Sequence, residues 1–291
     1  MGRAHDSRMD LRALGVTLVA LVLFAASCGG SDAKKTKSAP KKEVFTEPIS
    51  STSNPFTPPA GTDQSVPPVQ PQGVSTQPGG QPGLFGGTMQ EGSCNKEQLI
   101  TFLEQNPDKG QSWASTLGIN FTDIRTYVTR LTPVLLRSDT RLTNHGWKNG
   151  KITSIQVVLQ AGTAVLVDEK GFPVTKCYCG NPLTPPEAYP PKYYGEKWDY
   201  FNPNSLTVVQ KNVTIIDIFV LVDPKTGQSF MRPRGTDGAA DIPSTPPPSS
   251  GPPATTRPAP PTTHPSTTPP ATTFPPPSTT PTPSTMHTPS T

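Results

Sequence analysis

The stretch TRLTNHGWKNGKITSIQVV, residues 140–158, decides the fold. It contains Asn149-Gly150, a dipeptide strongly favoured in two-residue β-hairpin turns because both residues tolerate positive φ. Threonine, isoleucine and valine are frequent on either side of it, and these residues are typical of strands. The sequence therefore predicts two paired strands, over residues 140–143 and 151–158, that flank residues 145–150.

Two more hairpins are predicted downstream by apolar runs that end in turn residues. The runs 163–167 and 215–222 lead into the sequences DEKG and DPKTG and return through residues 174–179 and 229–231. Aspartate, proline and glycine are the residues that tight turns prefer. Each of these pairs of strands would be antiparallel.

Before the first hairpin, the chain has the apolar spacing of helices. Asn95 with Gln98 three residues later has the form of a capping box, and the apolar residues that follow recur along one helix face. Capping residues and prolines predict a first helix from Asn95 to Asn106, a second over 109–117 and a third from Asn120 to Pro133. The fold class expected is α+β, with N-terminal helices packed on an antiparallel sheet built from hairpins.

Composition confines this fold to the middle of the chain. Of 291 residues, 39 are proline and 24 glycine, and only 32% are hydrophobic, a smaller share than globular proteins have. These numbers exclude a multi-pass membrane protein and a coiled coil. We expect one folded domain over residues 93–242, a largely disordered Lys- then Pro/Gly/Ser-rich tether over 28–92, and a disordered Pro/Thr/Ser-rich tail over 243–291.

The N-terminus predicts export and a lipid anchor. Three arginines precede a charge-free run, residues 13–26, which is typical of a signal peptide and too short to span a bilayer. The run leads into Ala25-Ala26-Ser27-Cys28, which resembles a bacterial lipobox. Residues 1–27 are therefore predicted to be a lipoprotein signal peptide, with Cys28 acylated and the protein held at the extracytoplasmic face of the cell membrane. The alternative is an ordinary cleaved signal with Cys28 incidental.

Charge and motifs exclude several partners. The net charge is +4, and basic and acidic residues nearly balance within residues 93–242, so no nucleic-acid partner is expected. Neither a Walker A nor a Rossmann glycine pattern occurs. No cofactor is expected.

Three cysteines remain once Cys28 is acylated, in a compartment where disulfides form. On a strand, Cys177 and Cys179 would point to the same face, too splayed for an easy mutual bond. A disulfide from Cys94 to Cys179 is predicted, with Cys177 as the alternative partner. Cys179 is favoured because Gly180-Asn181-Pro182 ends the strand, at a place that the start of a helix can approach.

The same residues allow two alternatives. Cys94, Cys177, Cys179 and His145 could form a Cys₃His zinc site, although the C-x-C spacing is shorter than zinc ligands usually have. A thiol of Cys177 or Cys179 with His145 could instead form the nucleophile pair of an envelope hydrolase.

Aromatic residues gather among four prolines in residues 185–201. Clustered rings on a stiff loop suit stacking on a sugar or a peptide, which predicts a ligand surface. The alternative is that these rings cover the sheet as a small satellite core. The candidate ligand residues are Tyr189, Tyr193, Tyr194, Trp198 and Tyr200.

Several stretches together resemble a family of actinobacterial extracytoplasmic proteins catalogued only as a domain of unknown function. They are TNHG (143–146), LQAGTAVLVD (159–168), CYCGNPLTPP (177–186) and FVLVDP (219–224), with EPI (47–49) and NPFT (54–57). The resemblance covers about residues 43–233 and implies export and a single β-rich domain, with no activity attached. It also implies that residues 47–57 pack on the domain, against the prediction from composition.

These observations predict a lipid-anchored cell-envelope protein whose domain binds a wall polymer or another exported protein without catalysing a reaction. The envelope hydrolase is the alternative. The cysteines discriminate between them, because a bridged or buried thiol cannot act as a nucleophile.

Overall fold

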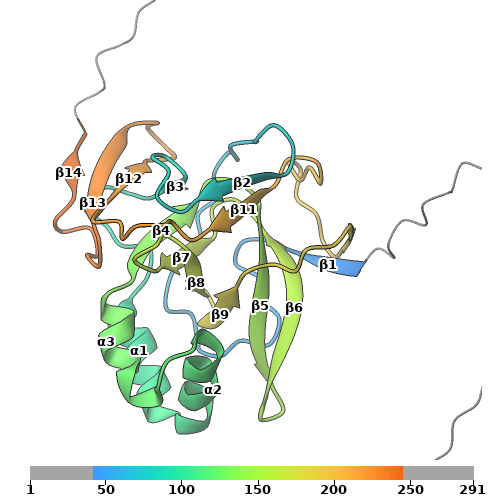
Figure 1. Ribbon diagram of the computed structural model, residues 1–291, viewed down its shortest axis with the longest axis vertical. Coiled ribbons are helices and arrows are strands. Elements are labelled where there is room, and N and C mark those ends of the chain that lie inside the picture. Colours follow the sequence, from blue (N-terminus) through green and yellow to red (C-terminus); the bar gives the residue numbers. More distant parts are fainter. Residues whose placement is uncertain (1–41, 245–291) are drawn as a thin grey trace, which may run out of the picture. The chain divides into compact units, whose positions relative to one another are not determined.

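The computed structural model describes residues 42–244 (Figure 1). Residues 1–41, with the predicted signal peptide and Cys28, and residues 245–291, which make up nearly all of the predicted tail, lie outside the described residues. Within the described part, no helix has the length and apolar character needed to cross a membrane.

A mixed sheet of 14 strands dominates the domain, in the order β10-β1-β6-β5-β9-β8-β7-β4-β3-β12-β13-β14, with β11 joined to β5 and β2 joined to β11. The strands are β1 (Lys42–Glu47), β2 (Ser75–Pro78), β3 (Phe85–Gly86), β4 (Thr132–Leu136), β5 (Thr140–Lys148), β6 (Lys151–Leu159), β7 (Ala164–Val167), β8 (Pro173–Lys176), β9 (Asn181–Thr184), β10 (Pro191–Tyr194), β11 (Thr207–Gln210), β12 (Ile218–Val222), β13 (Ser229–Pro233) and β14 (Ile242–Pro243).

The central hairpin forms where the sequence predicts it. Strands β5 and β6 pair antiparallel from Thr140↔Leu159 to Lys148↔Lys151. The turn residues Asn149 and Gly150 have φ of 52° and 73°, the two positive values that a type I′ turn requires. The hairpins β7–β8 and β12–β13 also form as expected.

The helices are short and lie together at one end of the sheet (Figure 1). They are α1 (Lys96–Gln105), α2 (Pro107–Leu117), the 3-10 turn η1 (Phe121–Asp123) and α3 (Ile124–Thr129). The Asn95 side chain accepts the Gln98 N–H at 2.9 Å, which is half of the capping box that the sequence suggested.

The expected fold class, α+β with helices packed on an antiparallel sheet, is wrong. The domain is predominantly β, and its sheet is mixed, because β1 runs parallel to both β10 and β6 and β2 runs parallel to β11. Parallel neighbours come from distant parts of the chain, so the turn signals that reveal hairpins could not reveal them.

The first three strands come from the segment that composition predicted to be a disordered tether. Residues 42–92 instead belong to the folded domain, as the resemblance over residues 47–57 implied. Few apolar side chains hold them, chiefly Val44, Phe56 and Phe85, each fully buried or nearly so. Backbone hydrogen bonds also attach this segment to the domain. Thr57 N–H donates to the Cys179 carbonyl at 2.9 Å, and Ala60 N–H donates to the Cys177 carbonyl at 3.0 Å. Amino-acid composition reflects only the side chains, so it cannot predict hydrogen bonds between backbone groups.

The β1–β6–β5 part of the sheet has a different core on each face. Phe45, Val157 and Leu142 point into the main core, which also receives the apolar faces of the helices. Their neighbours Val44 and Val158 point the other way and start a second, smaller core. Because successive residues of a strand alternate between faces, Arg141, which pairs with Val158, also lies on this second face.

Candidate functional site

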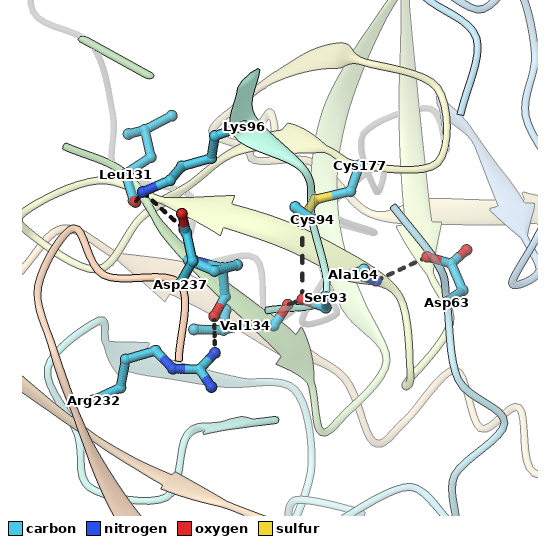
Figure 2. The surroundings of a disulfide bond; sticks show 11 residues. Asp63, Ser93, Cys94, Lys96, Leu131, Val134, Ala164, Cys177, Arg232 and Asp237 are labelled. Carbon is cyan, nitrogen blue, oxygen red and sulfur yellow. Dashed lines mark hydrogen bonds and ion pairs between the residues drawn. A yellow bond between two sulfur atoms is a disulfide. The ribbon is translucent and has the colours of Figure 1, made fainter. Parts of the chain in front are cut away.

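The disulfide joins the start of α1 to the turn after β8 (Figure 2). Cys94 is bonded to Cys177, with Cα atoms 5.6 Å apart, and Cys179 is a free, buried cysteine. The preferred partner Cys179 was therefore wrong and the alternative Cys177 is correct. The strand ends at Lys176, and Gly180 N–H closes a turn onto the Lys176 carbonyl at 2.9 Å. The two cysteines thus lie in a turn and do not share a strand face.

The cysteines do not form either of the alternative reactive sites. Cys177 is oxidised, and burial, the largest effect, raises the pKa of the Cys179 thiol to about 11. His145 exchanges a hydrogen bond with Thr184 Oγ1 at 2.8 Å. Residues 42–244 hold no group of three or more side chains able to ligate a metal ion. The disulfide contradicts the Cys₃His zinc site and a Cys177 nucleophile. Cys179, the other thiol of the nucleophile hypothesis, forms no hydrogen bond with His145 among the described residues.

A hollow of about 740 Å³ lies beside the disulfide. Lys96, the buried charge at its wall, is already paired: its ammonium group lies 2.8 Å from Asp237 and donates to three backbone carbonyls (Figure 2). On the far side of the disulfide, Asp63 accepts the Ala164 N–H at 2.8 Å. These contacts fasten the start of α1 to the sheet, so the surroundings of the disulfide are structural.

Residues 185–205, here called the aromatic loop, cover the second face of the sheet. Tyr189, Tyr193, Trp198 and Phe201 pack against the small core of Val44, Val158 and Leu206. The rings of Trp198 and Phe201 are 5.1 Å apart, a distance typical of a stable aromatic pair. These rings therefore form a small satellite core on the sheet, which was the alternative to a ligand surface.

Two of the five candidate ligand residues are well exposed. Tyr194 is 40% and Tyr200 is 64% exposed. Tyr200 and the half-buried Trp198 both line a cleft of about 270 Å³, whereas Tyr194 is not among the residues that line it. Of the five candidates, Tyr189 and Tyr193 pack in the small core, Tyr200 lines the cleft, Trp198 does both and Tyr194 does neither.

The opposite wall of the cleft is residues 65–68, Ser-Val-Pro-Pro. This wall is held in place by backbone bonds on both sides, Gln64 N–H to the Gly162 carbonyl at 2.9 Å and Val69 N–H to the Arg137 carbonyl at 2.7 Å. Gly162 has φ of 94°, and a Cβ atom there would collide with the Gln64 carbonyl. Glycine at this position thus permits the close approach of the wall to the sheet.

Asp139, a buried residue between β4 and β5, also lines the cleft. Its carboxylate accepts the Ala161 N–H through Oδ1 at 2.9 Å and the Trp198 Nε1–H through Oδ2 at 3.0 Å. Burial is the largest influence and raises its pKa from 3.8 to about 6, against the opposite effect of these two bonds. The bond from Trp198 fixes the indole ring at the cleft wall.

Asp139 has no recognisable signal in the sequence. Its partner Trp198 lies 59 residues away in the chain, and Ser138-Asp139 by itself looks like an ordinary polar turn. The clustered aromatic residues of the aromatic loop can be recognised in the sequence, whereas the carboxyl group of Asp139 cannot.

Comparison with known proteins gives one match. A family model described as a domain of unknown function, DUF6777, matches residues 75–235, more than half of the chain. No curated protein matches the chain, and no solved structure does. The match overlaps most of the stretch, about residues 43–233, for which the sequence showed a resemblance. It confirms the resemblance to a domain of unknown function.

Proposed function

The chain belongs to the DUF6777 family of domains of unknown function, and from this premise we propose that it is a lipid-anchored extracytoplasmic protein whose domain binds a glycan of the cell envelope. The anchor is Cys28, and the ligand binds in the cleft between Trp198, Tyr200 and residues 65–68. Export agrees with the disulfide, because such bonds persist mainly outside the cytosol.

One observation carries the proposal of a glycan ligand. Two aromatic side chains, Trp198 and Tyr200, line a cleft that the buried residue Asp139 also lines. Sugar rings stack their C–H faces on aromatic rings, and a carboxylate that already accepts two hydrogen bonds has lone pairs left for a ligand hydroxyl. The cleft volume of about 270 Å³ is close to the lower end for small-molecule sites. It suits one sugar unit of a longer polymer.

Binding without catalysis is supported by the state of the side chains. The hydrolase proposed from sequence needed a reactive thiol near His145, but Cys177 is bonded to Cys94, and the remaining thiol, Cys179, is buried with its pKa raised to about 11 by that burial. Asp139 is held by two donors from the protein itself. The bond from Trp198 orients its indole ring in the cleft lining, which gives Asp139 a role in ligand binding.

The test is a titration of the purified chain with soluble fragments of bacterial wall glycan, followed by the fluorescence of Trp198. Tyr200→Ala should raise the Kd about tenfold, because an aromatic stacking contact contributes about 1–1.5 kcal/mol. Tyr194→Ala is the matched control, an exposed tyrosine of the same loop outside the cleft lining, and should leave the Kd unchanged.

The signal needs its own control because the chain has three tryptophans. Trp198→Phe should abolish the fluorescence change, since Trp113 and Trp147 belong to or pack against the main core. Equal losses in the Tyr200 and Tyr194 variants would contradict the cleft as the binding site. Binding of a proline-rich peptide in place of the glycan would contradict the ligand class.

A further inference from the structure

Arg141 is a buried cation that has no anionic partner among residues 42–244. It comes from β5, on the sheet face that the aromatic loop covers, and is only 8% exposed. None of the ion pairs formed by the described residues includes it. Its Nη2 donates to the Glu187 carbonyl at 3.3 Å, and its Nε is buried with no hydrogen-bond partner. Burying an arginine in this way is costly, and natural proteins nearly always compensate for it.

The other buried arginine of the domain shows the usual compensation. Arg232 is fully buried, and its guanidinium binds both carboxylate oxygens of Asp241, at 2.9 and 2.6 Å, and three backbone carbonyls. All three nitrogens of that guanidinium donate to acceptors within the protein. The same fold thus gives a carboxylate partner to the buried Arg232 but none of the described carboxylates to the buried Arg141. The difference is therefore specific to the surroundings of Arg141.

A second polar group without a partner lies on the same face. The phenolic oxygen of Tyr193 is buried and makes no hydrogen bond with the described residues. The charge of Arg141 acts on Tyr193, where it opposes the larger effect of burial, which raises the pKa of this phenol. The strand pairing places both groups on one sheet face: Tyr193 pairs with Val44 and Arg141 with Val158, and these two valines belong to the same small core.

The charges around this site leave it positive. The guanidinium carbon of Arg141 lies 5.8 Å from the ring centre of Tyr189, and the ammonium group of Lys42 lies 4.9 Å from the same centre. Glu187 is the nearby acid, and its carboxylate is paired with Lys42 at 3.2 Å. Within the part of the chain that the structure describes, no ion pair therefore neutralises the second cation, Arg141.

We infer that Arg141 and the Tyr193 hydroxyl bind an oxyanion, a carboxylate or phosphate group of a ligand that reaches beneath the aromatic loop. The planar guanidinium presents paired N–H donors that fit the two oxygens of such a group, and the phenol supplies a further donor. This site lies apart from the cleft at Trp198 and Tyr200, and it stands whether or not that cleft binds a glycan. The alternative is that buried water satisfies both groups.

Thermal unfolding of the purified chain tests this inference. It is measured at pH 7 and one ionic strength in sodium phosphate, sodium acetate and sodium chloride. A ligand that binds only the folded state raises Tm, so phosphate or acetate should raise it by about 3 °C or more over chloride. Because phosphate also stabilises proteins non-specifically, the anion whose shift depends on Arg141 identifies the oxyanion class. Equal Tm values in the three salts would overturn the inference in favour of buried water.

Two variants locate the effect. Arg141→Met should abolish the difference between salts, whereas Arg137→Met, at a partly buried arginine that donates to the Gly83 carbonyl, should retain it. A shift that survives unchanged in Arg141→Met would overturn the assignment. If that variant does not fold, Tyr193→Phe replaces it and should at least halve the shift. Line broadening of the phosphorus NMR signal of inorganic phosphate by the unmutated chain, lost in Tyr193→Phe, would support the site directly.

Discussion

At the scale of single residues, the carboxyl group of Asp139 makes stability depend on pH. Its pKa is raised to about 6 in the folded chain, from 3.8, chiefly by burial. Between these two pH values the folded state holds a proton that the unfolded state has lost, so stability falls as pH rises through this window. The shift corresponds to about 3 kcal/mol. We expect the unfolding free energy in urea to be larger at pH 4 than at pH 7 by about this contribution.

Asp139→Asn isolates that contribution from those of other groups. The difference in unfolding free energy between the unmutated chain and this variant should shrink by about 3 kcal/mol from pH 4 to pH 7. Asp199→Asn changes an exposed aspartate that lines the same cleft and should keep the pH dependence of the unmutated chain. Parallel curves for the unmutated chain and Asp139→Asn would show that Asp139 does not titrate in this window.

Buried polar residues were the part of the structure hardest to predict. Glu47 and Lys176, both fully buried, form an ion pair at 2.5 Å across 129 residues of sequence. Asn144 donates to the same carboxylate at 3.0 Å, and Asn181 donates to Asn144 at 3.0 Å. In the sequence these residues look like ordinary surface positions, because charged and amide side chains are usually exposed. Only the folded topology brings them together.

At the scale of elements, local signals were reliable and distant ones were not. The hairpin at Asn149-Gly150 and the helix start at Asn95 were predicted because each depends on residues within a few positions. The strands β1, β2 and β3 were missed because their partners lie far along the chain, as in the pairing of Phe45 with Val157. The aromatic loop could be recognised from its composition, but its division into a small core and a cleft depends on which face of the sheet it covers.

The strand β14 shows how an element at the edge of the sheet can be essential. It has only two residues, Ile242–Pro243, but Asp241 immediately before it is the carboxylate that neutralises Arg232. A chain that ends at residue 233 would leave a fully buried arginine without this partner. Breaking a buried ion pair in this way costs about 3–5 kcal/mol, so its urea midpoint should be much lower than that of a chain ending at residue 244.

Asp241→Asn in the full chain separates the ion pair from the loss of residues. It should reproduce most of the destabilisation, because the amide keeps the shape of the side chain and removes its charge. Asp223→Asn, at an aspartate of the β12–β13 turn that forms no ion pair among the described residues, is the comparison. Equal stability of the two truncated chains would show that the Arg232–Asp241 pair contributes little.

At the scale of the whole molecule, the folded domain begins close to the proposed anchor. Composition predicted a tether from Cys28 to residue 92, whereas β1 starts at Lys42. Residues 29–41 can span at most about 45 Å if fully extended. The domain would thus stay near the membrane surface, which is consistent with a ligand in the inner part of the cell envelope.

The anchor itself gives the last prediction. Cys28→Ser removes the thiol that acylation needs, and two acyl chains are what hold a protein on a bilayer durably. In a bacterial host that processes lipoproteins, the unmutated chain should partition into the detergent phase of a phase-separation assay. The serine variant should move to the aqueous phase or accumulate with its signal peptide uncleaved. Cys179→Ser, at a buried thiol of the folded domain, should partition like the unmutated chain. If the unmutated chain and Cys28→Ser both partition into the aqueous phase, the lipid anchor is wrong and residues 1–27 act as an ordinary cleaved signal.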